Sequence, residues 1–182
     1  MNRIASQARC CQQRYTRFGL LAISLLLAAG VSAQNVQQLT DRAAIAEQIA
    51  RYSYAADGKD ANAFAALFAE DAVWKMFPAG AAEPSITLNS RAEIRKFSED
   101  LNKQNPDART GHHQSGLLFT ELTANTATTQ NMILVAQQGP KDESPHIVVS
   151  GIYYDTWIKT RAGWLIKSLT LRMQPLPLPA PK

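Results

Sequence analysis

The apolar residues of this chain repeat with a helical period up to about residue 104 and with a strand period after about residue 110. Ile45, Ile49 and Tyr52 recur at i, i+4 and i+7, which is the spacing of one helix face. Beyond the Asn105-Pro106-Asp107 break, β-branched residues alternate with polar ones, which is typical of half-buried strands. Helices followed by antiparallel strands predict an α+β domain in which a curved sheet packs on the helices.

The helical region predicts three helices. The first covers Asp41–Ala56 after a polar lead-in, with Thr40 or Asp41 as its N-cap and Gly58 as its left-handed stop. Asp60 caps a shorter second helix that carries Phe64, Leu67 and Phe68 at helical spacing and ends at Glu70-Asp71.

The third helix starts with a capping box, Ser90-x-x-Glu93, in which each side chain bonds an otherwise unpaired backbone N–H. Ile94, Phe97 and Leu101 follow at helical spacing, so this helix is predicted over Arg91–Lys103.

Residues 72–77 predict a short strand and residues 78–89 a loop, which contains two prolines and a glycine. Four longer strands separated by short turns predict an antiparallel meander. They cover residues 111–122, 126–137, 147–160 and 164–173.

The N-terminal 33 residues have the three parts of a cleavable export signal. Four arginines precede an uncharged apolar run, Phe18–Gly30, and Val31-Ser32-Ala33 supplies the small residues of a cleavage site. The run is shorter than the roughly 20 residues of a membrane span. We therefore expect residues 1–33 to be removed, leaving Gln34 first, in a periplasmic or secreted protein with no membrane attachment.

Removal of the signal changes the composition. Both cysteines, Cys10 and Cys11, lie in the signal, so the remaining 149 residues have no disulfide or thiol chemistry. Four of the 19 basic residues and none of the 15 acidic ones are lost, which leaves 15 of each and no basic cluster for a nucleic-acid partner. Residues 34–174 are expected to form one domain, followed by a Pro-rich tail at 175–182.

The run IAEQIARYSYAADGKDANAFAALFAEDAVW resembles the opening of the SnoaL-like branch of the nuclear transport factor 2-like superfamily, which includes scytalone dehydratase and polyketide cyclases. Thr110-Gly111-His112-His113 and the Gly151-x-Tyr153-x-Asp155 and Gly163-Trp164-x-Ile166 segments resemble later strands of that family. The resemblance implies a cone-shaped α+β barrel with a deep pocket, often dimeric. Because the family contains both enzymes and non-catalytic binders, it does not imply one activity.

If the protein is an enzyme, the resemblance implies acid–base chemistry beside a carbonyl, with His112 as the base, Asp57 as its orienting partner and Tyr54 as a polarising donor. His112 and His113 are strand neighbours, so only one can face the pocket. Scytalone dehydratase has a second histidine on the next strand, where this chain has Asn131, and a tyrosine beside its aspartate, where this chain has Ala56. These differences argue against that particular enzyme.

Candidate ligand-binding residues come from the same comparison and from the aromatic positions. They are Tyr52, Trp74, Phe97, Asn131 and Met132. Apolar members of this set either line a pocket or fill the core, and packing is the default. Tyr153, Asp155 and Trp157 share a strand face, with Asp155 expected to pair with an Arg or Lys of the neighbouring strand.

We therefore expect a homodimeric small-molecule-binding protein with a pocket for a hydrophobic or cyclic ligand. The alternative is a cofactor-independent lyase or isomerase acting on a ring or polyketide-like carbonyl compound. Three scattered histidines do not resemble a metal site, and no phosphate-binding glycine-rich loop is present.

Overall fold

The computed structural model describes residues 36–175, which excludes the expected signal and the Pro-rich tail. The chain divides into two units at Asp41. Residues 36–41, the described part of the first unit, are helical. The second unit begins at Arg42 and contains every strand of the described residues. No helix within residues 36–175 is long and apolar enough to cross a membrane.

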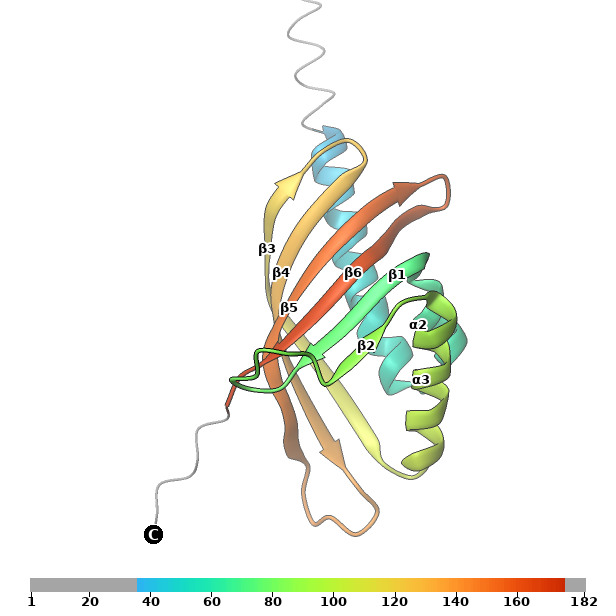
Figure 1. Ribbon diagram of the computed structural model, residues 1–182, viewed down its shortest axis with the longest axis vertical. Coiled ribbons are helices and arrows are strands. Elements are labelled where there is room, and N and C mark those ends of the chain that lie inside the picture. Colours follow the sequence, from blue (N-terminus) through green and yellow to red (C-terminus); the bar gives the residue numbers. More distant parts are fainter. Residues whose placement is uncertain (1–35, 176–182) are drawn as a thin grey trace, which may run out of the picture. The chain divides into compact units, whose positions relative to one another are not determined.

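Six strands form one sheet in the order β2-β1-β6-β5-β4-β3 (Figure 1). Their bounds are β1 Phe68–Phe77, β2 Ile86–Leu88, β3 Arg109–Leu122, β4 Thr126–Gln138, β5 His146–Thr160 and β6 Gly163–Met173. Strands β3 to β6 form the predicted antiparallel meander, while β1 pairs in parallel with β6.

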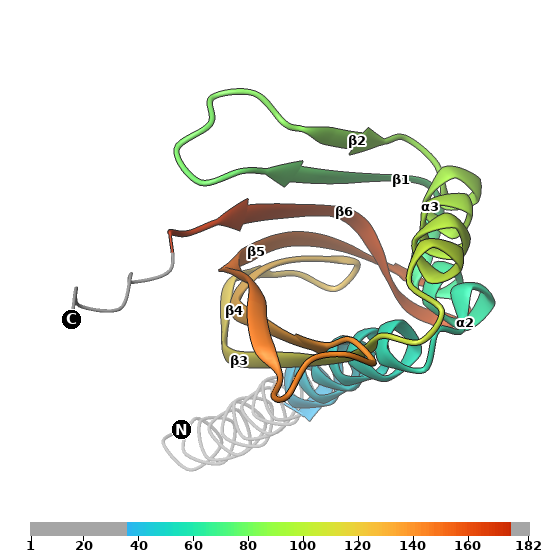
Figure 2. The same ribbon diagram turned by 90° about the horizontal axis from the view of Figure 1, so that it is seen from below.

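The sheet curves around an interior that the helices cover from the open side (Figure 2). The edge strands β2 and β3 are not paired with each other, so the sheet does not close into a barrel. The predicted α+β class with a curved sheet around helices is confirmed. The helices are not all N-terminal to the sheet, because β1 and β2 precede the third helix.

The helices begin where capping groups are available. The first is continuous over residues 36–57, so the described part of the expected polar lead-in, residues 36–39, is helical and the predicted N-cap at residues 40–41 is wrong. Helix α2, Ala61–Ala66, is capped by Asp60, whose carboxylate accepts from the N–H groups of Asn62 and Ala63.

Helix α3, Arg91–Gln104, begins at Ser90, whose hydroxyl accepts from the N–H of Glu93 at 3.2 Å. The Glu93 carboxylate accepts from the N–H of Asn89 at 2.8 Å, one residue before the position expected of a capping box.

Strand β1 begins at Phe68, so Glu70 and Asp71 lie within a strand and do not end a helix. Phe64, Leu67 and Phe68 fit a helix by spacing, but α2 stops at Ala66 because Phe68 enters the sheet beside Ile166. The expected loop over residues 78–89 contains β2, which adds three residues to the edge of the sheet.

The core lies between the inner sheet face and the helices. Its largest side chains, Phe68, Trp157 and Trp164, are at most 2% exposed. Burial of side chains of this kind contributes about 1.5–3 kcal/mol each. Tyr153, Asp155 and Trp157 are buried on one face of β5, as predicted.

Candidate functional site

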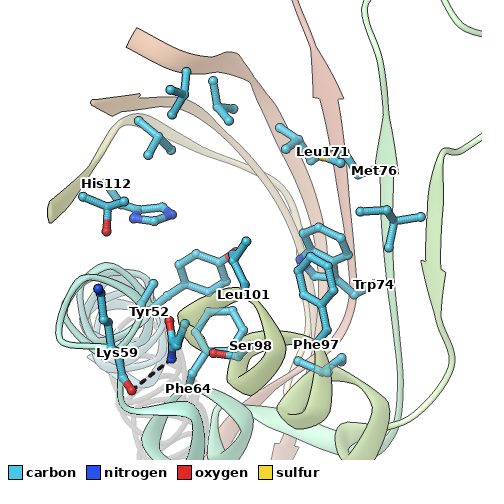
Figure 3. A pocket seen from close by; sticks show the side chains of 18 of the residues that line it. Tyr52, Lys59, Phe64, Trp74, Met76, Phe97, Ser98, Leu101, His112 and Leu171 are labelled. Atoms are coloured by element: carbon cyan, nitrogen blue, oxygen red, sulfur yellow. Dashed lines mark hydrogen bonds between the residues drawn. The ribbon is translucent and has the colours of Figure 1, made fainter. Parts of the chain in front are cut away.

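A cavity of about 480 Å³ occupies the interior between α3, the first helix and the sheet (Figure 3). Its wall is mostly apolar, with a few polar groups, which is the usual composition of a small-molecule site. The polar or titratable members of its lining are Tyr52, Lys59, Ser98, Asn102, Asn105, Thr110, His112, Gln137 and Tyr153, together with the indole of Trp74.

Strand alternation places His112 in this cavity. His112 on β3 pairs with Val135 on β4, and both side chains face inward. Two residues further along each strand, Thr110 pairs with Gln137, and both of these residues also line the cavity. His113 does not line it, as expected of the strand neighbour.

Gly151 allows β5 and β6 to approach closely beside this wall. A Cβ at this position would meet the backbone oxygen of Arg172 and would lie 3.0 Å from a methyl carbon of Leu171. Glycine in a strand interior commonly marks such a close approach of two backbones.

Asp57, the last residue of the first helix, binds His112 through both carboxylate oxygens. Its Oδ2 accepts from the backbone N–H of His112 at 2.9 Å, and its Oδ1 lies 2.6 Å from the Nδ1 of the ring. The two side chains are 27% and 17% exposed, so water screens the pair only in part. The contact predicted between Asp57 and His112 is present.

The carboxylate determines which ring nitrogen carries the proton. An ionised carboxylate only accepts hydrogen bonds, so Nδ1 of His112 is the donor to Asp57. In the neutral ring, Nε2 then keeps its lone pair. The ring projects into the cavity (Figure 3), so this arrangement presents a base to a bound molecule.

Two buried tyrosines form a donor pair beside the histidine. The hydroxyls of Tyr52 and Tyr153 are 3.2 Å apart, and the rings of Tyr52 and His112 meet edge to face at 6.1 Å. Burial raises the pKa of Tyr52 to about 12 and that of Tyr153 well above its ordinary value. Both phenols therefore stay protonated, and since one O–H suffices for their mutual bond, the other is available to a ligand oxygen.

Lys59 takes the left-handed position after the first helix, with φ of 56°, in place of the predicted Gly58. Its ammonium group donates to the backbone oxygens of Asn105 and Pro106 at 2.7 and 2.5 Å, and its own carbonyl accepts from Asn102. These contacts hold the end of the first helix against the end of α3 at the cavity wall.

Asp155 is 3% exposed and pairs with no Arg or Lys among residues 36–175, so the expected ion pair is wrong. Its partner across the strands is Thr129, whose hydroxyl donates to Oδ2 at 3.4 Å. Burial raises the pKa of Asp155 to about 8. The carboxyl is therefore largely protonated at neutral pH, which avoids an uncompensated buried charge.

The structure places three predicted site residues away from the cavity. Tyr54 is 81% exposed, because two residues of helix turn it about 200° from Tyr52. Met132 is 55% exposed on the outer sheet face. Asn131 faces inward, but its amide bonds Gln114 at 2.8 Å and it does not line the cavity.

Of the other predicted residues, Tyr52, Trp74 and Phe97 line the cavity with His112. The sequence reasoning missed Tyr153, Lys59 and Thr110 as lining residues. Strand alternation marks Thr110, two residues before His112, as facing the same way, but no local signal places Tyr153 against Tyr52, 101 residues away. Among residues 36–175, no group of three or more His, Cys, Asp or Glu side chains could hold a metal ion.

Solved structures similar to this chain share its fold. A proposed scytalone dehydratase from Novosphingobium aromaticivorans is 24% identical, with a TM-score of 0.65 over 78% of this chain and 89% of that one. An NTF2-like protein with a cystatin-like fold from the same organism is 23% identical, with a TM-score of 0.65 over 80% and 90%. ActVI-ORFA from Streptomyces coelicolor is 19% identical, with a TM-score of 0.61 over 72% and 96%.

No curated protein matches the chain. The sequence pattern of the SnoaL-like domain matches residues 37–170, which covers the helices, the whole sheet except its last residues, and every cavity residue described above except Leu171. The α+β fold around the cavity agrees with this match. The chain therefore belongs to the SnoaL-like domain family.

Proposed function

We propose that this protein binds a small, ring-containing carbonyl compound in the cavity and that His112 removes a proton from the carbon beside the carbonyl. The observation that carries the proposal is the Asp57–His112 contact, which leaves Nε2 of the ring as a base inside an apolar cavity. A positioned imidazole of this kind contributes about 10²–10⁴ in rate to proton transfer.

The remaining groups supply what this step needs. As Nε2 takes the proton, the C–H electron pair moves toward the carbonyl, and negative charge develops on the carbonyl oxygen. The free O–H of the Tyr52–Tyr153 pair donates to that oxygen. The imidazolium then returns the proton to another carbon, which is an isomerisation, or to a departing β-hydroxyl, which leaves as water in a dehydration.

A second candidate function is carriage of a hydrophobic ligand without chemistry. The apolar lining, with Phe64, Phe97 and Leu171 among its members, favours it. The two functions differ in their dependence on His112, because binding by an apolar wall does not need the imidazole.

The test uses 2-tetralone, an enolisable ring ketone, and follows exchange of its α-protons for deuterium by NMR. This readout needs only a base and an oxyanion donor, so it does not require the natural substrate. We expect the protein to accelerate exchange and His112→Ala to abolish most of the acceleration, with His113→Ala as the matched control that retains it. Equal exchange rates for the wild type and His112→Ala would contradict the proposed proton transfer and favour carriage of a hydrophobic ligand.

We also propose that the protein works outside the cytoplasm, as the N-terminal 33 residues suggest. Expression of the full chain in a Gram-negative host should give a periplasmic protein whose N-terminal residue, by intact mass, is Gln34. Recovery of the uncut chain from the cytoplasm would contradict export.

Dimerisation through the outer sheet face is a further proposal. Exposed apolar side chains gather on β3, β4 and β5, namely Leu118, Met132, Leu134 and Tyr154. Apolar residues gathered on one face are typical of an interface. Light scattering should give twice the chain mass for the wild type and the chain mass for Met132→Glu, and a monomeric wild type would contradict the proposal.

A further inference from the structure

The indole N–H of Trp74 is a buried hydrogen-bond donor without a partner in the described structure. Trp74 lies on β1, is 7% exposed and lines the cavity. Buried polar groups are nearly always paired, because an unpaired one loses its hydrogen bonds to water without replacement. The indole of Trp157, in the deep core, is paired, because it donates to Thr129 at 2.8 Å.

The position of this donor is fixed by its neighbours. The Trp74 ring packs on Phe97 with centroids 5.5 Å apart and an interplanar angle of 35°. Trp74 and Leu88 are paired across β1 and β2, which sets the side chain on the inner face. The Trp74 side chain is therefore held in one orientation, and its N–H points in a fixed direction.

Trp74 and Tyr52 extend into the cavity from opposite walls, with His112 on the side of Tyr52 (Figure 3). Burial has the largest effect on the pKa of Tyr52 and raises it, while the nearby Tyr153 hydroxyl and Trp74 indole act in the opposite direction. The indole thus lies near the phenol oxygen, although it does not form a hydrogen bond of good geometry with it.

We propose that Trp74 is a catalytic donor, and that its Nε1–H and the Tyr52–Tyr153 pair together bind the oxygen of the ligand. This inference rests on the proposed function, since it assigns the second donor to the oxyanion that proton removal creates. Two fixed donors at one oxygen select a carbonyl, enol or phenol oxygen and discriminate against a methyl group in the same place, which would leave both donors unpaired.

The first experiment follows the three indole N–H resonances of the wild-type protein by ¹⁵N-edited NMR. The probe is 2-naphthol, which has the shape of the enol of 2-tetralone, and its isostere 2-methylnaphthalene lacks the oxygen. We expect 2-naphthol to move the Trp74 Nε1–H resonance downfield, while 2-methylnaphthalene does not, and the Trp157 resonance should stay in place with both.

The second experiment uses Trp74→Phe, which removes the N–H and keeps an aromatic ring. One lost hydrogen bond of about 1.4 kcal/mol corresponds to about tenfold in affinity. We expect 2-naphthol to bind Trp74→Phe about tenfold more weakly, with 2-methylnaphthalene affected much less. In the 2-tetralone assay, the same variant should lower kcat and leave KM nearly unchanged.

The outcomes separate the two proposals. Equal movement of the Trp74 resonance with both probes, or equal weakening of both by Trp74→Phe, would show that the indole only packs and would overturn this inference alone. Loss of α-proton exchange in His112→Ala would still support the proposed function in that case. Failure of the wild type to bind 2-naphthol at all would overturn both.

Discussion

Asp57 holds His112 at two points, through the backbone N–H at 2.9 Å and the ring Nδ1 at 2.6 Å. One group at the end of a helix therefore fixes both the position of the β3 strand and the orientation of the imidazole. Fixing the ring in this way selects the tautomer that leaves Nε2 as the base. The contact spans 55 residues of sequence, so it depends on the fold being formed.

Replacement of Asp57 by asparagine should damage catalysis more than stability. The two donors of His112 face different carboxylate oxygens, so with the amide oxygen on the backbone N–H the NH₂ faces the ring. That NH₂ would favour an unprotonated Nδ1, so Nε2 would carry the proton. We expect the exchange rate to fall about 10²–10⁴-fold, while the free energy of unfolding falls by about 1–3 kcal/mol. Asp60→Asn, which keeps an N-cap acceptor, is the control, and a catalytic rate like the wild type in Asp57→Asn would contradict the assignment.

The Tyr52 hydroxyl should be needed for the chemical step. Tyr52→Phe removes a buried oxyanion donor from the cavity wall, and losses of about 10²–10³ in kcat are typical of such donors. Tyr54→Phe is the matched control on the same helix, because Tyr54 is exposed to solvent and should have no effect. Steady-state kinetics of proton exchange measure the difference between the two variants. Equal rates in Tyr52→Phe and Tyr54→Phe would show that the Tyr52 hydroxyl takes no part in the chemical step.

The close approach of the two strands at Gly151 should not tolerate a side chain. A Cβ there would meet the backbone oxygen of Arg172, which belongs to the paired strand and cannot move aside cheaply. We expect Gly151→Ala to lower the free energy of unfolding by about 1–3 kcal/mol, measured by urea denaturation. The neighbouring Ser150→Ala should be close to neutral, and equal stability of the two variants would mean that the close approach does not require a glycine.

Stability should depend on pH through Asp155. Its folded-state pKa of about 8 lies above the roughly 3.9 of an unfolded chain. Between these values the folded protein holds a proton that the unfolded chain releases, so this residue makes the free energy of unfolding fall as pH rises. The fall is up to about 1.4 kcal/mol per pH unit and ends above about pH 8.

Asp155→Asn should remove this dependence, because a neutral amide replaces the neutral carboxyl at all pH values. Urea denaturation at several pH values between 5 and 9 measures it, and the exposed Asp107→Asn should keep the wild-type slope. A wild-type slope in Asp155→Asn would mean that another group carries the pH dependence.

Much of the fold could be predicted from the sequence, because period and capping are local signals. The four long strands lie within two residues of their predicted bounds, and Asp60 and Ser90 cap helices as expected. Phe68 shows where local signals fail. Its spacing from Phe64 suits a helix, but its pairing with Ile166 places it in a parallel strand, and that pairing is visible only in the folded chain.

The candidate site could be predicted only in part. The pairing of Asp57 with His112 followed from a family resemblance, and the structure contains it. Tyr54 and Met132 failed because helix and strand periods turn them outward, a signal that was present in the sequence. The unpaired N–H of Trp74 had no sequence signal, since it is defined by the absence of an acceptor in three dimensions.

The central claim is that Asp57 keeps the proton of His112 on Nδ1 and leaves Nε2 free to act as a base. Long-range ¹H–¹⁵N correlation spectra of the imidazole, recorded above the titration of the ring, distinguish the two neutral tautomers directly. The account predicts a protonated Nδ1 and an unprotonated Nε2 in the wild type, with the reverse in Asp57→Asn. A protonated Nε2 in the wild type would contradict it, because that nitrogen could then not accept a proton from the ligand.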